Sequence, residues 1–358
     1  MRVQPIWSGR LSAGALRIAV CLPQVPFAHG GAEILASNLV SELTRRGHDV
    51  ALVTVPFRWY PDRQLLENML VWRLLRLDRG DRPPDVVIGT KFPSYLVRHP
   101  RKVVWLFHQL RQAYDMHGTE FAQFGDDPHG AAMRQAIRKA DHVALSEATG
   151  VLTISANTAE RLRTFNGIDA EVCYPPAQLA GLRSIGDDGS VLSVGRLDPA
   201  KRTDLLIRAI ARVPDGRATI VGEGGDRPRL ERIAADLGVA DRVSFVGRID
   251  DQALRQAYGR CRCVYFAPVD EDFGMVTIEA HSAAKPVLTT TDAGGVLEFV
   301  QDGRTGLVVA PDILALGSGL ARLLSDADLA RRLGEAGQGA ARALGWDHVV
   351  ERLLAAAG

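Results

Sequence analysis

The chain has 358 residues, of which 46% are hydrophobic and 24% are charged, and its formal net charge is +1. This length is sufficient for two domains with separate cores, and this composition excludes a chain that is disordered over most of its length. The balanced charge gives no general attraction to nucleic acid, and no segment combines clustered Lys and Arg with interleaved aromatic residues. No nucleic-acid partner is therefore expected.

Membrane-spanning and secreted classes are not expected either. No apolar run approaches the roughly 18 residues that a membrane-spanning helix needs. The apolar stretch Leu16 to Leu22 is interrupted by Arg17 and lacks a cleavage pattern, so a secretory signal is not expected. The four cysteines lack metal-ligand spacing and are interpreted as reduced core residues, with the last two on one face of one strand: Cys21, Cys173, Cys261 and Cys263. The cytoplasm is the expected compartment.

Strand-like and helix-like segments alternate in the first half of the chain. Strands are predicted at Leu16 to Leu22, Asp49 to Val55, Val86 to Ile88 and Val103 to Phe107, with a helix from about Ala32 to Arg46. Such alternation predicts a parallel sheet with helices on its faces.

A second series of the same kind begins at Val191 to Val194. Further strands are predicted at Ala218 to Val221, Val243 to Val246, Val264 to Ala267 and Val287 to Thr290, separated by helical patterns. The second half therefore predicts a second Rossmann-like unit.

The composition between the two series indicates a linker, because it contains Tyr174-Pro175-Pro176 and a polar, Gly-rich stretch. We predict a first domain over residues 1–178, a linker over 179–189, a second domain over 190–340 and a last helical segment over 341–358. The expected fold class is α/β, with two Rossmann-like domains facing a central cleft, which is the usual place for a ligand site.

Two carboxylates, Glu271 and Glu279, stand eight positions apart around an Asp-Phe-Gly turn. They follow the apolar run Cys263 to Ala267, and a helix is predicted to begin at Met275. Ligands bind in α/β proteins at such a junction of strand, turn and helix. Both carboxylates can accept hydrogen bonds from the vicinal hydroxyls of a sugar or a ribose. The amides around Gly274 and the positive end of the helix would suit a phosphate.

Two cations occupy the loop Gly195 to Arg202, which follows the first strand of the second series and precedes a predicted helix at Thr203 to Arg212. Arg196 offers a planar fork and Lys201 a point charge, a combination that suits a diphosphate. A solvated loop is the alternative for this pair alone. Its position at a strand end, together with the two glutamates, favours the diphosphate site.

Three glycine-containing loops follow predicted strands. In the first, Gly30 and Gly31 would let a substrate approach the backbone closely, although a merely tight turn is the equal alternative. The second, Gly222 to Gly225, includes Glu223, and the third spans Asp292 to Glu298. Together they predict a cleft lined with backbone.

His108 comes directly after the predicted strand Val103 to Phe107, so it should project near the same cleft, with a structural role as the alternative. The segment Asp270-Glu271-Asp272 has the Asp-x-Asp pattern that holds a divalent metal in another class of sugar-transfer enzymes. Because Arg196 and Lys201 can neutralise a diphosphate, neither a metal nor another cofactor is expected.

These residues and their order resemble the retaining glycosyltransferases of family four, also called glycosyl transferases group 1, over nearly the whole chain. The resemblance rests on Gly-Gly-x-Glu at Gly30 to Glu33, Gly-Arg-Leu-x-x-x-Lys at Gly195 to Lys201, Gly-x-Gly at Gly222 to Gly224, and Glu-x-Phe-Gly with the second Glu at Glu271 to Glu279. Members of that family have the two-domain GT-B fold and use nucleotide-sugar donors.

The resemblance implies that Arg196 and Lys201 hold the donor diphosphate, that Glu279 holds the ribose, and that Glu271 holds the donor sugar. His108 would sit beside the transferred sugar on the acceptor side. The predicted catalytic residues are these two cations, Glu271 and His108. The other predicted donor-binding residues are Gly30, Gly31, Gly195, Gly222, Glu223 and the backbone of Phe273, Gly274, Met275 and Val276.

The implied reaction is attack by an acceptor hydroxyl on the face that the nucleotide diphosphate leaves, with retention of configuration, no protein nucleophile and usually no metal. The acceptor would be a polysaccharide, a lipid-linked saccharide or glycolipid, or a small metabolite. Two alternatives stay open: a nucleotide-sugar epimerase on the same fold, and a catalytically silent subunit that binds the nucleotide sugar without turnover.

Some features depart from the family or lie outside its motifs. Leu297 stands where the family often has Pro, and the loop Thr119 to Gly130 is long and acidic in the domain that selects the acceptor. The helix around Trp346 to Leu354 would cross back to the first domain, as in related folds. The basic run Arg98 to Lys102 could meet anionic lipid at the inner membrane face, with a solvated loop as the alternative.

Overall fold

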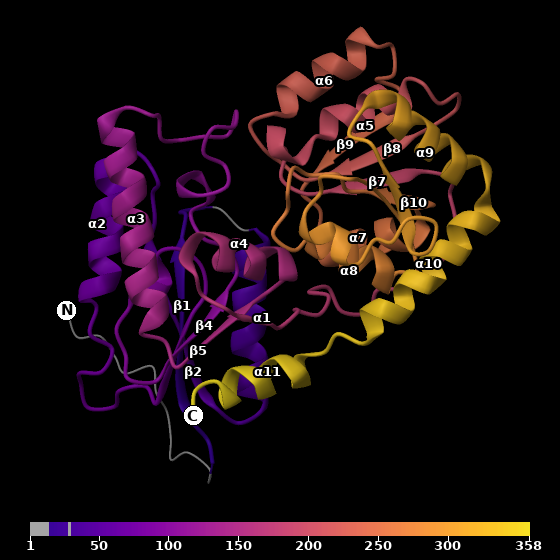
Figure 1. Cartoon of the computed structure of the whole chain (residues 1–358). Helices are drawn as coiled ribbons and strands as arrows, with labels where there is room; N and C mark the ends of the chain where they lie inside the picture. The colour runs from indigo at the N-terminus through magenta and orange to yellow at the C-terminus, as the bar shows by residue number, and fades with distance from the viewer. Residues whose placement is uncertain (1–13, 28–29) are drawn as a thin grey trace. The chain divides into compact units, whose positions relative to one another are not determined.

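The computed structural model describes residues 14–27 and 30–358. The chain divides into two compact units, one formed by Met1–Pro175 with Trp346–Gly358 and the other by Pro176–Gly345. Each unit contains a six-stranded sheet in which all paired strands are parallel (Figure 1). The prediction of two parallel α/β units is therefore confirmed.

The sheet of the first unit has the strand order β2-β1-β3-β4-β5-β6. Its elements in chain order are β1 (Arg17–Gln24), α1 (Gly31–Arg45), β2 (Asp49–Pro56), α2 (Asp62–Leu74), β3 (Val86–Gly89), the short turn η1 (Ser94–Leu96), β4 (Lys102–Leu106), η2 (Arg111–Ala113), α3 (Pro128–Ser146), β5 (Gly150–Thr153), α4 (Ala156–Asn166), β6 (Glu171–Val172) and α11 (Trp346–Ala355).

The central strands of this sheet are buried on both faces, which explains why they form continuous apolar runs rather than alternating patterns. Val104 packs in one core cluster with residues of α2 and α3, such as Trp72 and Ile137. The next residue of β4, Trp105, points to the opposite face, where its ring lies 6.2 Å from that of Trp346 in α11. Helices thus cover both faces of the sheet.

The sheet of the second unit has the strand order β12-β11-β10-β7-β8-β9. Its elements in chain order are β7 (Val191–Val194), η3 (Pro199–Lys201), α5 (Thr203–Ile210), β8 (Ala218–Val221), α6 (Arg227–Asp236), β9 (Val243–Gly247), α7 (Asp251–Arg260), β10 (Cys263–Tyr265), α8 (Met275–Ser282), β11 (Val287–Thr290), η4 (Gly295–Glu298), β12 (Gly306–Val309), α9 (Ile313–Ser325) and α10 (Ala327–Arg342).

This strand order determines which loops can form a site. β10 pairs with β7 on one side and with β11 on the other. Because the carboxyl ends of parallel strands meet at one edge of a sheet, the loops that follow these three strands are neighbours. These are the loops that carry Lys201, Glu271 and Asp292.

The predicted elements agree with the structure to within two residues at their ends, with two corrections. Cys261 is not on the strand with Cys263. It is the C-cap residue that follows α7, its amide donating to Ala257 O, and β10 begins only at Cys263. The loop predicted from Thr119 to Gly130 ends early, because α3 already begins at Pro128. Asp127 caps that helix, since its carboxylate accepts from two amides of the first turn.

Candidate functional site

The first part of the candidate site is the loop between β7 and α5. Lys201 ends the short turn η3, and its ammonium lies 2.5 Å from the Glu271 carboxylate and 5.6 Å from the centre of the Phe266 ring. Arg196 is more open, because three quarters of its side chain is exposed and its Nε donates to Asp198 at 2.8 Å. One predicted cation is therefore paired in the site and the other lies toward solvent.

The second part is the loop that carries Glu271 between β10 and α8. Its backbone is bound to the neighbouring loop, because the Glu271 amide donates to Ala293 O at 3.1 Å and the Gly295 amide donates to Glu271 O at 2.8 Å. A Cβ added at Gly295 would lie 2.4 Å from Asp272 O. Glycine is required there because the two loops touch backbone to backbone.

A second ion pair ties these loops to Lys201. Arg202 binds Asp292 with two hydrogen bonds, of 2.9 and 2.6 Å. Asp292 also accepts from the amide of Asp270 through its backbone oxygen at 2.9 Å. Since Arg202 follows Lys201 and Asp270 precedes Glu271, this pair helps to fix the predicted cation beside the predicted carboxylate.

The glycine loop after β8 packs against the Lys201 loop. The Leu197 amide donates to Glu223 O at 2.9 Å, and a Cβ added at Gly222 would lie 1.9 Å from Gly195 O. Gly222 also has a φ of +133°. The structure therefore gives Gly222 a packing role between loops. The Glu223 side chain, predicted to be near the donor, is exposed.

A small surface pocket lies between β7, β10 and the loop after β7. It is lined by Ser193, Val194, Gly195, Arg196, Leu197, Lys201, Thr203, Tyr265 and Phe266. The pocket brings together three of the predicted donor-binding residues, Gly195, Arg196 and Lys201. Glu279 and Glu223 do not line it.

Glu279 lies in the second half of α8 and is half-buried. Tyr258 of α7 donates to its carboxylate at 2.8 Å. Burial raises the pKa of Glu279 to about 7, although the Tyr258 hydrogen bond opposes this shift. Sequence reasoning did not find Tyr258. This residue lies in α7, which is separated from α8 by β10, and nothing in the sequence of α7 distinguishes its hydroxyl.

The start of α8 carries the amides of Met275 and Val276. Gly274 precedes the helix with a φ of +81° and has no side chain of its own to cap the first turn. These amides lie at the positive end of the helix dipole, which favours an anion. The Phe273 side chain is buried and packs edge-on against Phe299, with ring centres 5.5 Å apart, so only its backbone can take part in the predicted donor contacts.

In the first unit, Gly30 and Gly31 form the start of α1. The Gly30 amide donates to the Glu33 carboxylate at 2.9 Å, and Lys91 binds the same side chain at 2.6 Å. Burial opposes ionisation of Glu33, but Lys91 and the Gly30 amide outweigh it, so its pKa lies below the ordinary value. Gly30 has an extended φ of −129°, so no unusual backbone angle demands glycine there. Lys91 was not predicted, because it lies 58 positions from Glu33.

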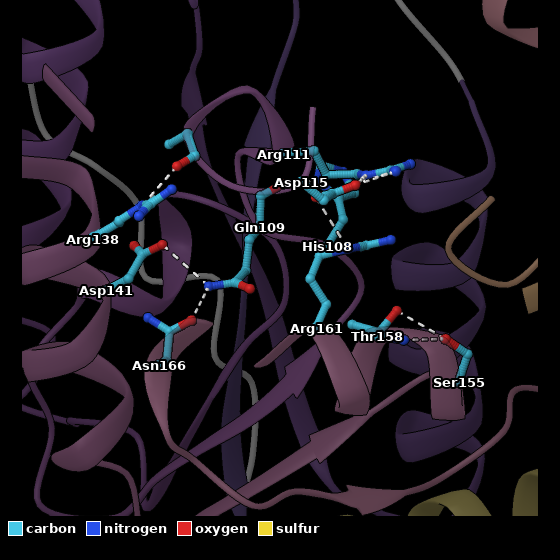
Figure 2. A network of polar contacts seen from close by, with 11 residues as sticks. His108, Gln109, Arg111, Asp115, Arg138, Asp141, Ser155, Thr158, Arg161 and Asn166 are labelled. Atoms are coloured by element: carbon cyan, nitrogen blue, oxygen red, sulfur yellow. Dashed lines mark hydrogen bonds and ion pairs between the residues drawn. The ribbon is translucent and has the colours of Figure 1, made fainter. Parts of the chain in front are cut away.

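His108 follows β4 as expected and is half-buried. Its Nδ1 lies 3.0 Å from Gln109 O. Figure 2 shows its ring on the side of Arg111, Asp115 and Arg161, while the Gln109 side chain leaves the chain in another direction. Arg161 of α4 lies 3.1 Å from Asp115, which also accepts from Arg111 Nε at 2.9 Å. Sequence reasoning missed Arg161, since no local pattern sets it apart from other helix arginines.

The second Asp-x-Asp pattern of the chain has a structural role. Asp326, from the second Asp-x-Asp pattern in the chain, caps α10 by accepting from the Leu329 amide at 2.8 Å. Within residues 14–27 and 30–358, no three His, Cys, Asp or Glu side chains gather in a way that could hold a metal ion.

The basic run at residues 98–102 is largely engaged in the first unit. Lys102 is fully buried and donates to Ala144 O at 2.7 Å, and Arg101 donates to Ala357 O at 3.1 Å. Arg98 is exposed. In the part of the chain that the structure describes, no helix has the length and apolar character needed to cross a membrane.

Comparisons with known sequences match the chain to two family models. Residues 29–177 match the model described as Glycosyltransferase Family 4, and residues 178–340 match the model described as Glycosyl transferases group 1. A D-inositol 3-phosphate glycosyltransferase of Stackebrandtia nassauensis is 34% identical over 209 residues, which are 54% of this chain and 47% of that protein. The chain thus spans about half the length of the first curated relatives that it matches.

A more distant relative aligns over more of its length. The D-inositol 3-phosphate glycosyltransferase of Mycolicibacterium paratuberculosis is 29% identical over 375 aligned positions, covering 91% of this chain and 85% of that protein.

Solved structures share the fold. Sucrose-phosphate synthase from Thermosynechococcus elongatus superposes with a TM-score of 0.81 at 22% identity, covering 96% of this chain and all of that one. Anabaena HepE, solved in complex with UDP and glucose, has a TM-score of 0.69 at 18% identity and covers 95% of this chain and 99% of its own. The predicted GT-B fold is confirmed. The two family models together extend from residue 29 to residue 340, and the chain belongs to the family 4, or group 1, glycosyltransferases.

Proposed function

We propose that this chain transfers a sugar from a nucleoside-diphosphate sugar to an acceptor hydroxyl, with retention of configuration, and that its second unit binds the donor. The observation that carries the proposal is the Lys201–Glu271 pair, 2.5 Å apart, at two adjacent strand ends. An ammonium that can meet a phosphate thus lies beside a carboxylate that can accept hydrogen bonds from sugar hydroxyls. Membership of the family supports the same conclusion.

In this proposal Lys201 and Arg196 bind the diphosphate. Lys201 exchanges Glu271 for a phosphate oxygen, and Arg196 turns from Asp198 toward the pocket, which its exposure permits. The amides at the start of α8 add positive potential at the phosphates. Glu271 then accepts hydrogen bonds from the sugar, and Glu279 accepts them from the ribose.

The proposed step needs no protein nucleophile. The acceptor oxygen forms a bond to the anomeric carbon on the face that the diphosphate leaves. The bond from that carbon to the phosphate oxygen breaks, and its electron pair stays on the diphosphate. The acceptor proton passes to a departing phosphate oxygen. Lys201, Arg196 and the start of α8 stabilise the negative charge that develops there, so the proposal includes no metal.

The candidate substrates come from the relatives and structural neighbours. HepE was solved with UDP and glucose, which makes uridine diphosphate the first nucleotide to test. The curated relatives are named for D-inositol 3-phosphate, which makes a cyclitol phosphate the first acceptor to test. A peripheral membrane contact through residues 98–102 has less support, since Lys102 is buried and Arg101 binds the carbonyl of Ala357.

A thermal-shift panel tests the donor site. UDP, GDP, ADP and TDP, with their sugar conjugates, are added with and without magnesium, because a ligand that binds the native state raises the unfolding midpoint. We expect a shift with one nucleotide family that does not depend on magnesium. The same donors are then incubated with cyclitol phosphates, and the anomeric configuration of the product is read by NMR. Absence of a shift with every nucleotide would overturn the donor site, and an inverted product would overturn the mechanism.

A further inference from the structure

A buried polar network in the first unit ends at the segment that carries His108. The Gln109 side chain is 2% exposed and donates to Asn166 at the end of α4, with Nε2 and Oδ1 2.9 Å apart. The same Nε2 lies 3.5 Å from Asp141 of α3. In Figure 2 this side chain extends away from His108 toward α3 and α4. The Gln109 side chain therefore anchors the backbone next to His108 to the core.

The far end of the same segment is attached to the same carboxylate. Tyr114 donates to Asp141 Oδ2 at 2.7 Å, and Asn166 lies 3.4 Å from the Tyr114 hydroxyl. Asp141 thus binds the segment at Gln109 and again at Tyr114, on both sides of η2. On the other side of the chain, His108 O accepts from the Phe92 amide at 3.2 Å.

Burying the carboxyl group of Asp141 is unfavourable in free energy. Asp141 is fully buried, and burial raises the pKa of its carboxyl to about 7, while hydrogen bonds from Tyr114 and Gln109, and the nearby Tyr95 hydroxyl, oppose the shift. Burying a carboxylate costs free energy, and an apolar residue of similar size could pack there without that cost. The two attachments of Asp141 to one loop segment point to a role in holding that segment.

The charged and titratable groups around Asp141 come from each element that packs against it. Tyr95 of η1 and Tyr114 after η2 present hydroxyls, and Arg138 of α3 lies over the Tyr114 ring at 5.3 Å and donates to Ala113 O. His142 of α3 contacts Asn166 O at 3.2 Å. Lys102 donates to Tyr95 O at 3.2 Å. None of these contacts replaces the two that Asp141 makes with the segment.

We propose that Asp141 is a positioning residue for the transfer reaction: through Gln109 and Tyr114 it holds the segment from His108 to Tyr114, and so the His108 ring, in the geometry that the acceptor side requires. The inference rests on the proposed function, because it takes His108 to lie beside the transferred sugar. It concerns the first unit alone and leaves the donor contacts of the second unit unchanged.

Two tyrosine variants give a matched test. Tyr114→Phe removes a hydroxyl that binds Asp141. Tyr95→Phe removes a hydroxyl of the same cluster that has no hydrogen-bond partner within residues 14–27 and 30–358. Asp141→Leu keeps a side chain of similar size but removes the oxygen, Oδ2, that accepts from both Tyr114 and Gln109.

We expect kcat to fall at least fivefold in Asp141→Leu and in Tyr114→Phe, with the donor KM changed less than twofold, and to stay within twofold of the parent in Tyr95→Phe. Equal losses in all three variants, or a loss confined to donor KM, would overturn the proposal.

A second measurement does not depend on turnover. Amide hydrogen exchange of the full chain should become faster at residues 108–114 in Asp141→Leu and Tyr114→Phe but not in Tyr95→Phe. Unchanged exchange in all three overturns the positioning role. If the parent transfers no sugar while exchange responds as expected, the proposed function fails and the structural part of the inference stands.

Discussion

At the scale of the residue, the contact between Lys201 and Glu271 is the observation on which the proposed donor site rests. Each occupies a loop that follows a strand, and the side chains meet at 2.5 Å although they lie 70 positions apart. With their side chains only 22% and 25% exposed, the pair is partly screened from water. An ammonium in that position interacts with a phosphate more strongly than one at an open surface.

Lys201→Ala should therefore weaken binding of the nucleoside diphosphate by about 2 kcal/mol, or roughly 30-fold in Kd, because a charge-assisted hydrogen bond is lost. Titration calorimetry with the nucleotide identified by the thermal-shift panel measures the change. Arg208→Ala is the control, since Arg208 belongs to the adjoining helix α5 and its nearest acid, Asp204, lies 3.9 Å away. Equal affinity of the Lys201 variant and the parent would contradict the assignment of the diphosphate site.

Glu279 should make the free energy of unfolding depend on pH. Burial is the main cause that raises its pKa from the ordinary 4.5 to about 7. Between these pH values the carboxyl therefore holds a proton in the native state that it has lost in the unfolded state. The free energy of unfolding should therefore fall as the pH rises through this window and change no further above it. Glu279→Gln stays neutral and should lack that fall.

Unfolding midpoints from pH 4 to pH 8 test this expectation for the parent and Glu279→Gln. The control is Glu335→Gln on the exposed side of α10, which should keep the decline of the parent. Parallel curves for the parent and Glu279→Gln would show that the Glu279 carboxyl titrates normally.

At the scale of the element, the candidate site is made by loops that touch through their backbones. The loop after β8 packs on the loop after β7, and the loop after β11 packs on the loop after β10. Hydrogen bonds between main-chain atoms position these loops, and side chains would prevent the approach at Gly222, Gly224 and Gly295. The glycines that look like ligand contacts in the sequence thus act mainly on neighbouring loops.

Gly222→Ala should destabilise the second unit by about 2–4 kcal/mol, because it adds a Cβ at 1.9 Å from Gly195 O and places a non-glycine residue at a φ of +133°. Gly225→Ala is the matched control in the same loop, since its added Cβ would meet no atom within 4 Å. Chemical denaturation measures both variants, and nucleotide binding should fall only in the first. Similar stability of the two variants would contradict this account of the loop.

At the scale of the whole molecule, the last helix belongs to the first unit although it follows the second in sequence. Arg352 of α11 binds Glu171 with two hydrogen bonds, of 2.6 and 2.5 Å. Trp346 packs edge-on near Trp105 of β4, and Leu353 is fully buried. The chain therefore enters the second unit and returns from it, so the stability of the first unit depends on residues at both ends of the sequence.

Leu353→Ala should destabilise the first unit by roughly 2–5 kcal/mol, the usual range for a leucine truncated in a packed core. Hydrogen exchange should become faster in β4 and β5 and stay the same in β7 and β8, because α11 packs in the first unit. Glu351→Ala, at an exposed position of the same helix, should leave both units unchanged. Faster exchange in the second unit alone would contradict the assignment of α11.

The sequence by itself determined the order of strands and helices, the two-unit fold and the position of Lys201 and Glu271 at strand ends. It could do so because buried parallel strands form short apolar runs, and because loops after such strands lie at one edge of a sheet. Only the tertiary structure decided that β10 lies between β7 and β11, and so which loops meet. It also decided the contacts of Tyr258 with Glu279, of Lys91 with Glu33, and of Asp141 with Tyr114. These contacts join distant parts of the chain, and their geometry follows from how helices pack on the sheets, which no local pattern of residues encodes.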